Sequence, residues 1–571
     1  MAVVFCPNAS AASFSVVEKT NSRVNLPTPA IVAERGAKAL PRIALLLFCA
    51  AYVLPGLFGR DPWRNADLSA FGFMASIAQG HAPWWHPAIG GIAAEGGPLP
   101  YWIGALAIKA MPFADAAFAA RLPYAVILVL VLVLVWYSSF HLARTEAAQP
   151  VAFAFGGEAQ EVDYARALAD GALLALMASL GLLQLGHETT PELLQLLAAA
   201  LYLYGLAAAP YRAVKARWAL LTSLPILAAS GAPAVAIAFS LLGAWLCRRS
   251  SYADVRGLTV WLLASGVLAA LSAWGFNAWA WRLTVGLNSD LPRQFFNLLG
   301  WFCWPAWPLA MWTLFRWRAH WQRRHILLPL IAAAVPLATS FLMDGSDRAL
   351  LLGLPALAVL ASFALPTLKR GFAAAMDWFS VFFFSACGLF VWVYYASMQL
   401  DWPAQPLANL RRLYPGFNPS FNVIALIAAS LATLAWFALV RWRTARIQHA
   451  LWKSLVLPAG GVALCWLLLM SLALPIANYT RSNTVLVERL RAQLPARVDC
   501  LAAPGVALST LAALEFQGQW TVDGSTPLTT SRCRYALQGA FATVPAGWVQ
   551  IASVQRPTDR ELSFVVLRRS E

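Results

Sequence analysis

The chain has 571 residues, of which 60% are hydrophobic and only 12% are charged. A soluble domain usually carries about 25% charged residues, so this chain has too little charge for a water-facing surface. Its 26 tryptophans and 31 phenylalanines exclude a disordered chain. In a membrane protein a net charge of +16 more often records orientation than a nucleic-acid partner, and we expect none. Composition therefore predicts a polytopic membrane protein.

The first 40 residues are mixed and polar, and we expect them to form a cytoplasmic tail. The apolar run at 42–58 has no small-residue cleavage site behind it, so it is predicted to be an anchor. The run 217–247 is broken by a Ser-Gly-Ala-Pro turn and is predicted to form two short spans. Further runs are long enough to cross about 30 Å of hydrocarbon: 122–142, 167–185, 191–210, 257–276, 298–316, 325–343, 348–366, 376–399, 421–440 and 454–477.

The segment 98–112 decides the predicted topology. It is apolar but short, begins with two prolines and contains Lys109. Such a segment is typical of an interfacial helix rather than a crossing. If it does not cross, the basic loops lie on the same face as the N-terminus, and the positive-inside rule makes that face the cytoplasm. We therefore predict about 13 transmembrane helices within residues 41–477, with the C-terminus outside.

The tail 478–571 returns to ordinary composition and ends in an alternating run at 562–567, which predicts a strand. We expect a small α/β domain there, outside the cytoplasm. Cys500 and Cys533 are the only cysteines in this polar region. An external domain permits a disulfide between them, and two free thiols are the alternative.

Ionisable residues gather in the first external loop, 59–121, and the span centres hold essentially none. Asp61, Arg64 and Asp67 are spaced by three, so in a helix they would share one face. The plainer alternative is that Asp61 caps an interfacial helix and Arg64 reaches toward water. Glu95 precedes a Gly-Gly-Pro turn, and its plainer alternative is a solvated loop carboxylate.

This order of motifs resembles the C-type (GT-C) glycosyltransferases, above all bacterial aminoarabinose transferases and protein O-mannosyltransferases. The likeness covers roughly residues 42–370 and is strongest in 59–123. It implies a helical membrane fold of the GT-C type. Gly96 stands where the family usually has a lysine. The motifs that carry the likeness are Asp61-x-x-Arg64-x-x-Asp67, Glu95-Gly-Gly-Pro-Leu-Pro-Tyr101-Trp102, Arg121-Leu-Pro123 and Asp347-Arg348 with the following Leu-Pro355.

The resemblance implies transfer of a hexose or pentose from a polyprenyl-phosphate-linked donor. The acceptor would be a lipid, glycan or protein on the external face of the bacterial inner membrane. Asp61 is the expected base, because an acceptor hydroxyl is a poor nucleophile at neutral pH, and Glu95 is the second catalytic candidate. Arginines would stabilise the charge on the leaving phosphate. The expected substrate-binding residues are Arg64, Asp67, Tyr101, His187, Glu188, Arg282, Arg293 and Arg348.

Several alternatives stay open at this level. Glu95 either orients the acceptor or helps to hold a divalent metal, and no metal is assigned because no cluster has clear ligand spacing. The turn around His187 and Glu188 is equally well explained as a capped helix start with Pro191 in its first turn. Two other classes of protein compete with the enzyme. One is a transporter or flippase of lipid-linked sugars, and the other is a non-catalytic scaffold that presents residues 478–571.

Overall fold

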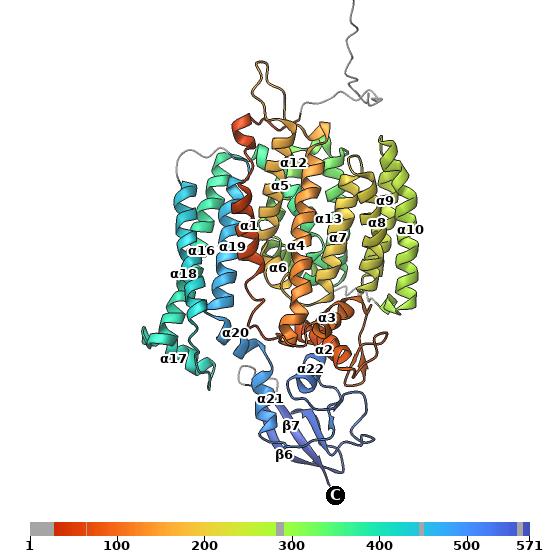
Figure 1. The fold of residues 1–571 in the computed structure, drawn as a ribbon, viewed down its shortest axis with the longest axis vertical. Coiled ribbons are helices and arrows are strands. Elements are labelled where there is room, and N and C mark those ends of the chain that lie inside the picture. The colour runs from red at the N-terminus through yellow and green to blue at the C-terminus, as the bar shows by residue number, and fades with distance from the viewer. Residues whose placement is uncertain (1–27, 64, 281–289, 445–449, 557–562, 571) are drawn as a thin grey trace, which may run out of the picture.

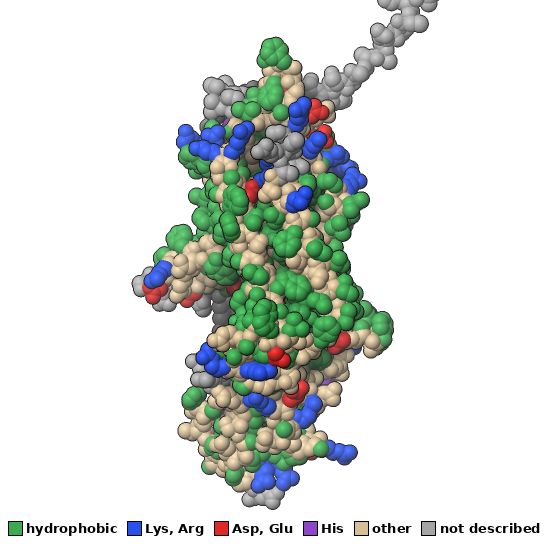
Figure 2. Space-filling model, turned by 90° about the vertical axis from the view of Figure 1, so that its left-hand side faces the viewer, with side chains coloured by type: hydrophobic (Ala, Val, Ile, Leu, Met, Phe, Trp, Pro, Cys, Tyr) green, Lys and Arg blue, Asp and Glu red, His purple; other side chains and the backbone are tan. Residues whose placement is uncertain are grey.

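The structure is a computed structural model that describes residues 28–570 apart from 64, 281–289, 445–449 and 557–562. Most of the helices run along one tall bundle, and a small C-terminal domain lies at one end of it (Figure 1). On the face drawn in Figure 2, hydrophobic side chains cover the middle of the bundle, and Lys and Arg side chains gather above and below them. This distribution is that of a multi-pass membrane protein.

Seven helices among the described residues are long and apolar enough to cross a membrane. Shorter apolar helices complete the bundle, so the exact number of 13 spans stays a prediction. The long helices are α4 (Ala116–Ala143), α7 (Pro191–Ala208), α10 (Ala253–Gly275), α13 (Arg324–Leu342), α16 (Arg370–Leu400), α18 (Val423–Thr444) and α19 (Lys453–Ser471). The shorter helices include α1 (Arg42–Val53), α8 (Ala213–Ala229) and α9 (Pro233–Arg248), and α17 (Ala404–Leu413) lies beside the bundle near the end that carries the C-terminal domain.

Three apolar runs that the sequence predicts as single spans are broken. The pieces are α5 (Glu161–Ala178) with α6 (Leu180–Leu185), α11 (Leu291–Phe302) with α12 (Ala306–Arg316), and α14 (Asp347–Leu351) with α15 (Leu354–Ser362). Proline precedes α12 and lies in the first turn of α15, where its missing N–H costs no hydrogen bond. Short 3₁₀ turns η1–η5 lie at Glu34–Ala37, Glu146–Ala148, Ala278–Ala280, Arg318–His320 and Leu365–Thr367.

The loop 59–121 folds into α2 (Ala66–Gln79), a short hairpin of β1 (Ala88–Ile89) and β2 (Ile92–Ala93), and α3 (Leu99–Ala110). α3 has 12 residues, which at about 1.5 Å per residue is too short to cross the hydrocarbon. It lies beside α2 at the end of the bundle that carries the C-terminal domain (Figure 1). The predicted N-cap role of Asp61 is wrong, because α2 begins only at Ala66, after Asn65.

The C-terminal domain has the predicted α/β character. Its sheet has the order β4-β3-β5-β7-β6, with parallel pairs around β3 and antiparallel pairs around β7. Cys500 and Cys533 are paired as a disulfide, with Cα atoms 5.0 Å apart. The elements are α20 (Leu474–Arg481), α21 (Thr484–Arg491), β3 (Leu501–Ala502), α22 (Leu508–Phe516), β4 (Val522–Asp523), β5 (Tyr535–Gly539), β6 (Trp548–Gln555) and β7 (Ser563–Arg569).

Candidate active site

The loop that follows α1 is held by one side chain from α20. The Asn478 amide oxygen accepts hydrogen bonds from the Asp61 backbone N–H and the Trp63 indole N–H, both at 3.2 Å. Its amide nitrogen donates to the Gly59 carbonyl at 2.9 Å. The Thr484 hydroxyl donates to the Asp61 carboxylate at 3.2 Å. These bonds fix the main chain around Asp61 and leave its carboxylate half-buried, at the junction of the bundle and the C-terminal domain.

Asp67 lies deeper and is fully engaged by the protein. One carboxylate oxygen accepts from the Thr189 backbone N–H at 2.8 Å and its hydroxyl at 2.9 Å. The other accepts from Arg60 and from the Trp63 N–H, both at 3.2 Å. Burial acts to raise the pKa of Asp67, but Arg60 and Arg121 together hold it below its ordinary value. These contacts make Asp67 an anchor for the loop, and a contact with substrate stays a prediction.

Two buried guanidinium groups lie behind this loop. Arg121 donates to the Arg60 carbonyl, and Arg60 donates to the His187 carbonyl at 2.8 Å. Arg60 also lies 4.9 Å from the centre of the Trp63 ring. Among the described residues, the Nε atoms of both arginines have no hydrogen-bond partner. Arg60 pairs with Asp67, and the charges of Asp67, Asp61 and Asp115 all act on Arg121, so these carboxylates balance the two buried cations.

His187 joins the helices around this centre. Its two ring nitrogens lie 2.6 Å from the Leu183 carbonyl and 2.8 Å from the Tyr52 carbonyl. Burial lowers the pKa of His187 to about 4, although both carbonyls act in the opposite direction. A neutral ring can donate to only one of these carbonyls, and the side chain packs between α1 and the turn after α6.

A second cluster surrounds Arg348 on α14. Its guanidinium contacts Glu192 at 3.0 Å and Glu188 at 3.1 Å. The second Glu188 oxygen accepts a 3.0 Å hydrogen bond from Gln184. Burial and the charge of Asp67 raise the pKa of Glu188 above its ordinary value, against the opposing effect of Arg348. This cluster brings together two of the residues that the sequence predicts, Glu188 and Arg348.

A cavity of about 270 Å³ opens beside Arg348. Two carboxylates and one guanidinium line it, so its charge does not favour a phosphate, whereas hydrogen-bonding groups suit the hydroxyls of a sugar. The Gln195 amide, which also donates to the Ser230 carbonyl at 2.7 Å, faces the same space. The polar lining is Glu95, Tyr101, Glu192, Gln195, Ser230, Thr339, Ser346 and Arg348.

The wall of this cavity explains the glycine at position 96. Gly96 has φ +110° and Gly231 has φ +100°, a region that side chains rarely adopt. A Cβ atom on Gly96 would lie 3.5 Å from Gly231 Cα, and one on Gly97 would lie 1.8 Å from the Ala229 carbonyl oxygen. A lysine at position 96 would therefore be strained by its own positive φ, although its Cβ atom would meet Gly231 at an ordinary contact distance.

Polar contacts connect the cavity with the Asp61 loop. Gln184, which binds Glu188, also accepts a hydrogen bond from Arg481 at 3.0 Å. The Arg481 guanidinium lies 5.0 Å from the centre of the Trp63 ring, and Trp63 shares Asn478 with Asp61. The predicted residues Asp61, Asp67, His187, Glu188 and Arg348 thus belong to one connected region. Glu95 and Tyr101 reach the region through the cavity wall.

The remaining predicted residues lie elsewhere. Arg64 and Arg282 fall outside the described residues. Arg293 is exposed on α11 and does not line the cavity. Within the described residues, no group of three or more His, Cys, Asp or Glu side chains could hold a metal ion. Glu95 therefore has no ready-made metal partners in that part of the chain.

Sequence reasoning missed several residues of this region. Asn478 follows the last apolar run and is separated from Asp61 by 417 positions, so spacing does not connect them. Gln184 and Gln195 are isolated polar residues in apolar runs, which is a weak signal for a polar site. Arg60 is adjacent to Asp61 and was detectable as a charge at the end of the first span.

No protein-family model and no curated protein matches the sequence of this chain. By structure, the chain is similar to ArnT from Cupriavidus metallidurans, solved bound to undecaprenyl phosphate and in the apo state. In both cases the TM-score is 0.56 at 13% identity, over 92% of this chain and 96% of that chain. The chain has a GT-C fold.

The oligosaccharyltransferase of Archaeoglobus fulgidus gives a TM-score of 0.41 at 11% identity, over 83% of this chain and 62% of that chain, in a crystal form with a tethered acceptor peptide. In the GT-C fold of the present chain, α2, α3 and the Asp61 loop lie between the bundle and the C-terminal domain (Figure 1).

Proposed function

We propose that the protein is a glycosyltransferase that moves a sugar from a polyprenyl-phosphate-linked donor to a hydroxyl-bearing acceptor. The fold it shares with ArnT, which was solved with undecaprenyl phosphate bound, supports a lipid-linked donor. The site lies at one end of the hydrophobic middle of the bundle, where a donor with a lipid tail and a polar head would be held. We place this end outside the cytoplasm, at the bacterial inner membrane.

Asp61 is our proposed general base, and its geometry is the observation that carries the proposal. Its main chain is fixed by Asn478, while the one described side chain that donates to its carboxylate is Thr484. The remaining acceptor capacity is available to an incoming hydroxyl. The acceptor oxygen would attack the anomeric carbon, its proton would pass to Asp61, and the bond from that carbon to the phosphate oxygen would break.

The polyprenyl phosphate that leaves carries negative charge, which nearby cations would stabilise. The positive charges of Arg60 and Arg121, which are buried beneath the Asp61 loop, would act on this phosphate. Arg481, whose guanidinium lies beside the Trp63 ring, would act on it as well. We retain Arg64, Arg282 and Arg293 as proposed phosphate contacts on the strength of the resemblance. None of these assignments requires a metal ion.

We assign the cavity beside Arg348 to the transferred sugar. Glu192 and Glu188 orient the Arg348 guanidinium, and Glu95, Tyr101 and Gln195 offer further hydrogen-bonding groups. A volume of about 270 Å³ is in keeping with a single sugar ring plus water. The acceptor, whether a lipid, a glycan or a protein, would approach Asp61 from the side of the C-terminal domain.

Mass spectrometry of the cell envelope tests this function. A deletion strain should lack one sugar modification on lipid A, on surface polysaccharide or on an envelope protein. The wild-type gene should restore it, whereas Asp61→Asn should not. Asp115→Asn is the matched control, because Asp115 caps α4 through the Phe118 N–H at 3.0 Å and Asn caps about equally well. Full restoration by Asp61→Asn would exclude Asp61 as the base. Loss of a lipid-linked sugar from one leaflet, with no modification missing, would identify a flippase instead.

A further inference from the structure

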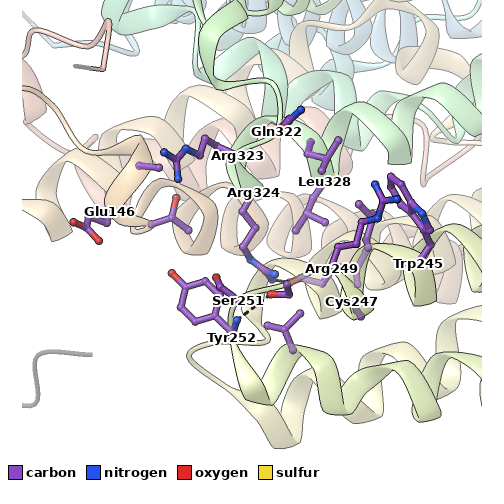
Figure 3. Close-up of a pocket in the computed structure, with 17 residues that line it drawn as sticks. Glu146, Trp245, Cys247, Arg249, Ser251, Tyr252, Gln322, Arg323, Arg324 and Leu328 are labelled. Atoms are coloured by element: carbon purple, nitrogen blue, oxygen red, sulfur yellow. Dashed lines mark hydrogen bonds between the residues drawn. The ribbon is translucent and has the colours of Figure 1, made fainter. Parts of the chain in front are cut away.

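A pocket rich in arginine lies at the opposite end of the bundle from the candidate active site. It has a volume of about 460 Å³ and is framed by the ends of α4, α7 and α9 and the beginnings of α10 and α13 (Figure 3). Three arginines and one glutamate line it: Arg249, Arg323, Arg324 and Glu146. The pocket therefore carries a net positive charge, and none of its residues takes part in the proposed reaction.

Two arginines of this pocket, Arg249 and Arg324, differ from others at the same end of the bundle. Arg144 binds Glu161 at 2.9 Å and Arg443 binds Asp377, so those charges are neutralised within the protein. Within the described residues, neither Arg249 nor Arg324 forms an ion pair with a carboxylate. The pocket thus holds positive charge that an external anion would balance.

Arg324 is held in place for such a role. Its guanidinium donates to the Leu206 carbonyl and lies 6.0 Å from the centre of the Tyr252 ring. Its Nε atom is buried and has no hydrogen-bond partner among the described residues. Figure 3 shows the Arg324 side chain extended toward Ser251 and Tyr252, which lie in the connection between α9 and α10. A buried donor without a partner costs free energy, and an acceptor in the pocket would relieve that cost.

The rest of the lining has a polar part, formed by Thr145, Ser250, Ser251, Tyr252 and Gln322, and an apolar part that continues toward the exposed surface of α9 and α10. The apolar part of the lining consists of Leu206, Leu246, Val255, Leu327 and Leu328. Trp245, which Arg249 covers at 4.2 Å, is 42% exposed on α9. Farther along the same pair of helices Leu241 is 60% exposed and Val260 is 71% exposed. A soluble phosphate would use only the rim, whereas a lipid would use the rim and the apolar wall.

We propose that this pocket binds the phosphate headgroup of an anionic phospholipid, with Arg249 and Arg324 as its ligands and the acyl chains lying along α9 and α10. Basic pockets between membrane helices are suited to such headgroups. The pocket is at the end of the bundle that we place in the cytoplasm, where the leaflet is rich in anionic lipid. The lipid would tie the ends of α9, α10 and α13 together.

Lipid titration of the delipidated full-length protein in detergent, followed by native mass spectrometry and thermal unfolding, tests this site. Phosphatidylglycerol should bind and raise the Tm, whereas phosphatidylethanolamine with the same acyl chains should do neither. Arg249→Gln should weaken phosphatidylglycerol binding about five-fold, since one arginine near a lipid surface contributes about 1 kcal/mol. Arg249→Glu should abolish binding at this site.

The neighbouring residue supplies the matched control. Arg248 is also exposed at the end of α9 but does not line the pocket, so Arg248→Gln should leave lipid binding unchanged. Equal effects of the two glutamine variants, or no effect of either, would overturn the proposal. Equal stabilisation by inorganic phosphate would also overturn it, because the apolar wall would then contribute nothing.

Discussion

Asp61 and Asp67 are six residues apart, yet their surroundings indicate different roles for the two carboxylates. Asp67 has four hydrogen bonds from the protein and is 2% exposed, whereas Asp61 is half-buried and accepts from Thr484. A carboxylate whose acceptor positions are all occupied cannot take a proton from a substrate without losing a structural bond. This difference separates the proposed base from the residue that positions its loop.

Replacing each aspartate by asparagine should separate the two roles in a stability measurement. Asp67→Asn leaves the buried Arg60 without its counter-ion, and breaking such a pair costs about 3–5 kcal/mol. Asp61→Asn removes no buried ion pair, so its Tm in detergent should stay near that of the wild type. Both variants would be compared by thermal unfolding. A large loss of Tm in Asp61→Asn would make Asp61 a structural residue.

Asn478 should matter for activity more than its distance in sequence suggests. Asn478→Ala removes three hydrogen bonds to the loop that carries Asp61. If the loop loses about 1.4 kcal/mol of positioning in the transition state, kcat falls about ten-fold. The expected effect is on kcat, with KM for the donor little changed.

Asn422→Ala is the control for this experiment, because Asn422 caps the distant helix α18 through the Ala425 N–H at 3.1 Å. It should lower stability slightly and leave kcat unchanged. If Asn478→Ala raised KM alone, Asn478 would serve donor binding rather than the position of Asp61.

At the scale of elements, α2 and α22 form the main contact between the loop 59–121 and the C-terminal domain. Phe71 and Phe516 meet edge to face, with ring centroids 4.6 Å apart. A Cβ atom on Gly72 would lie 2.4 Å from the Ala512 Cβ atom, so this glycine permits close approach of the two helices. Through this contact the C-terminal domain packs against α2, the helix that follows Asp61 in the chain.

Exchanging the two small residues tests that contact. Gly72→Ala should overpack it and destabilise the protein by about 1–3 kcal/mol. Adding Ala512→Gly should recover part of the loss, because it removes the nearest clash and leaves only the one with Ile89 Cδ1 at 2.9 Å and the close Ala512 Cα atom at 3.3 Å. Gly257→Ala is the control, since a Cβ atom there meets nothing within 4 Å. Thermal unfolding of Gly72→Ala, Ala512→Gly, the double variant and Gly257→Ala would test this contact. Additive losses from the two single exchanges would contradict close packing.

The elements also show how far sequence reasoning extends. Hydropathy correctly predicts the apolar helices, and residues 98–112 form the expected short helix α3, while its place at the membrane interface stays a prediction. The breaks before Ala306 and Leu354 were missed, because a broken span is as apolar as a continuous one. The alternative in which Asp61 caps a helix is wrong, because α2 begins only after Asn65, whose φ is +73°.

Much of the site depends on contacts that a linear pattern does not contain. Asp61, Glu188 and Arg348 were predicted because each lies beside a motif or a turn. Their connection through Gln184, Arg481 and Trp63 joins four separate parts of the chain. The two turns that meet at Gly96 and Gly231 are likewise invisible to spacing. Tertiary packing decides these contacts, so the sequence alone predicts the residues better than their arrangement.

At the scale of the whole molecule, the two ends of the bundle differ. The end away from the C-terminal domain carries the basic helix termini and the arginine pocket. The other end carries α2, α3, the C-terminal domain and the candidate active site. The positive-inside rule supports our proposal that the first end is cytoplasmic.

Cysteine labelling tests this orientation. Phe155, in the loop between α4 and α5, and Phe541, in the C-terminal domain, are almost fully exposed at opposite ends. In spheroplasts of a strain lacking the free native cysteines, Phe541→Cys should react with a membrane-impermeant maleimide. Phe155→Cys should react only after permeabilisation. The reverse pattern would place the candidate active site in the cytoplasm.

Transfer of a labelled sugar to an acceptor is the measurement that tests the central proposal most directly. The purified protein in lipid nanodiscs would be given radiolabelled polyprenyl-phosphate sugars together with extracted envelope acceptors. The account predicts acceptor-dependent transfer of label that Asp61→Asn lowers about 10²–10⁴-fold, the usual contribution of a general base, while Asp115→Asn retains it. Transfer that is undiminished in Asp61→Asn, or no transfer by the wild type from any polyprenyl-phosphate sugar, would contradict the account.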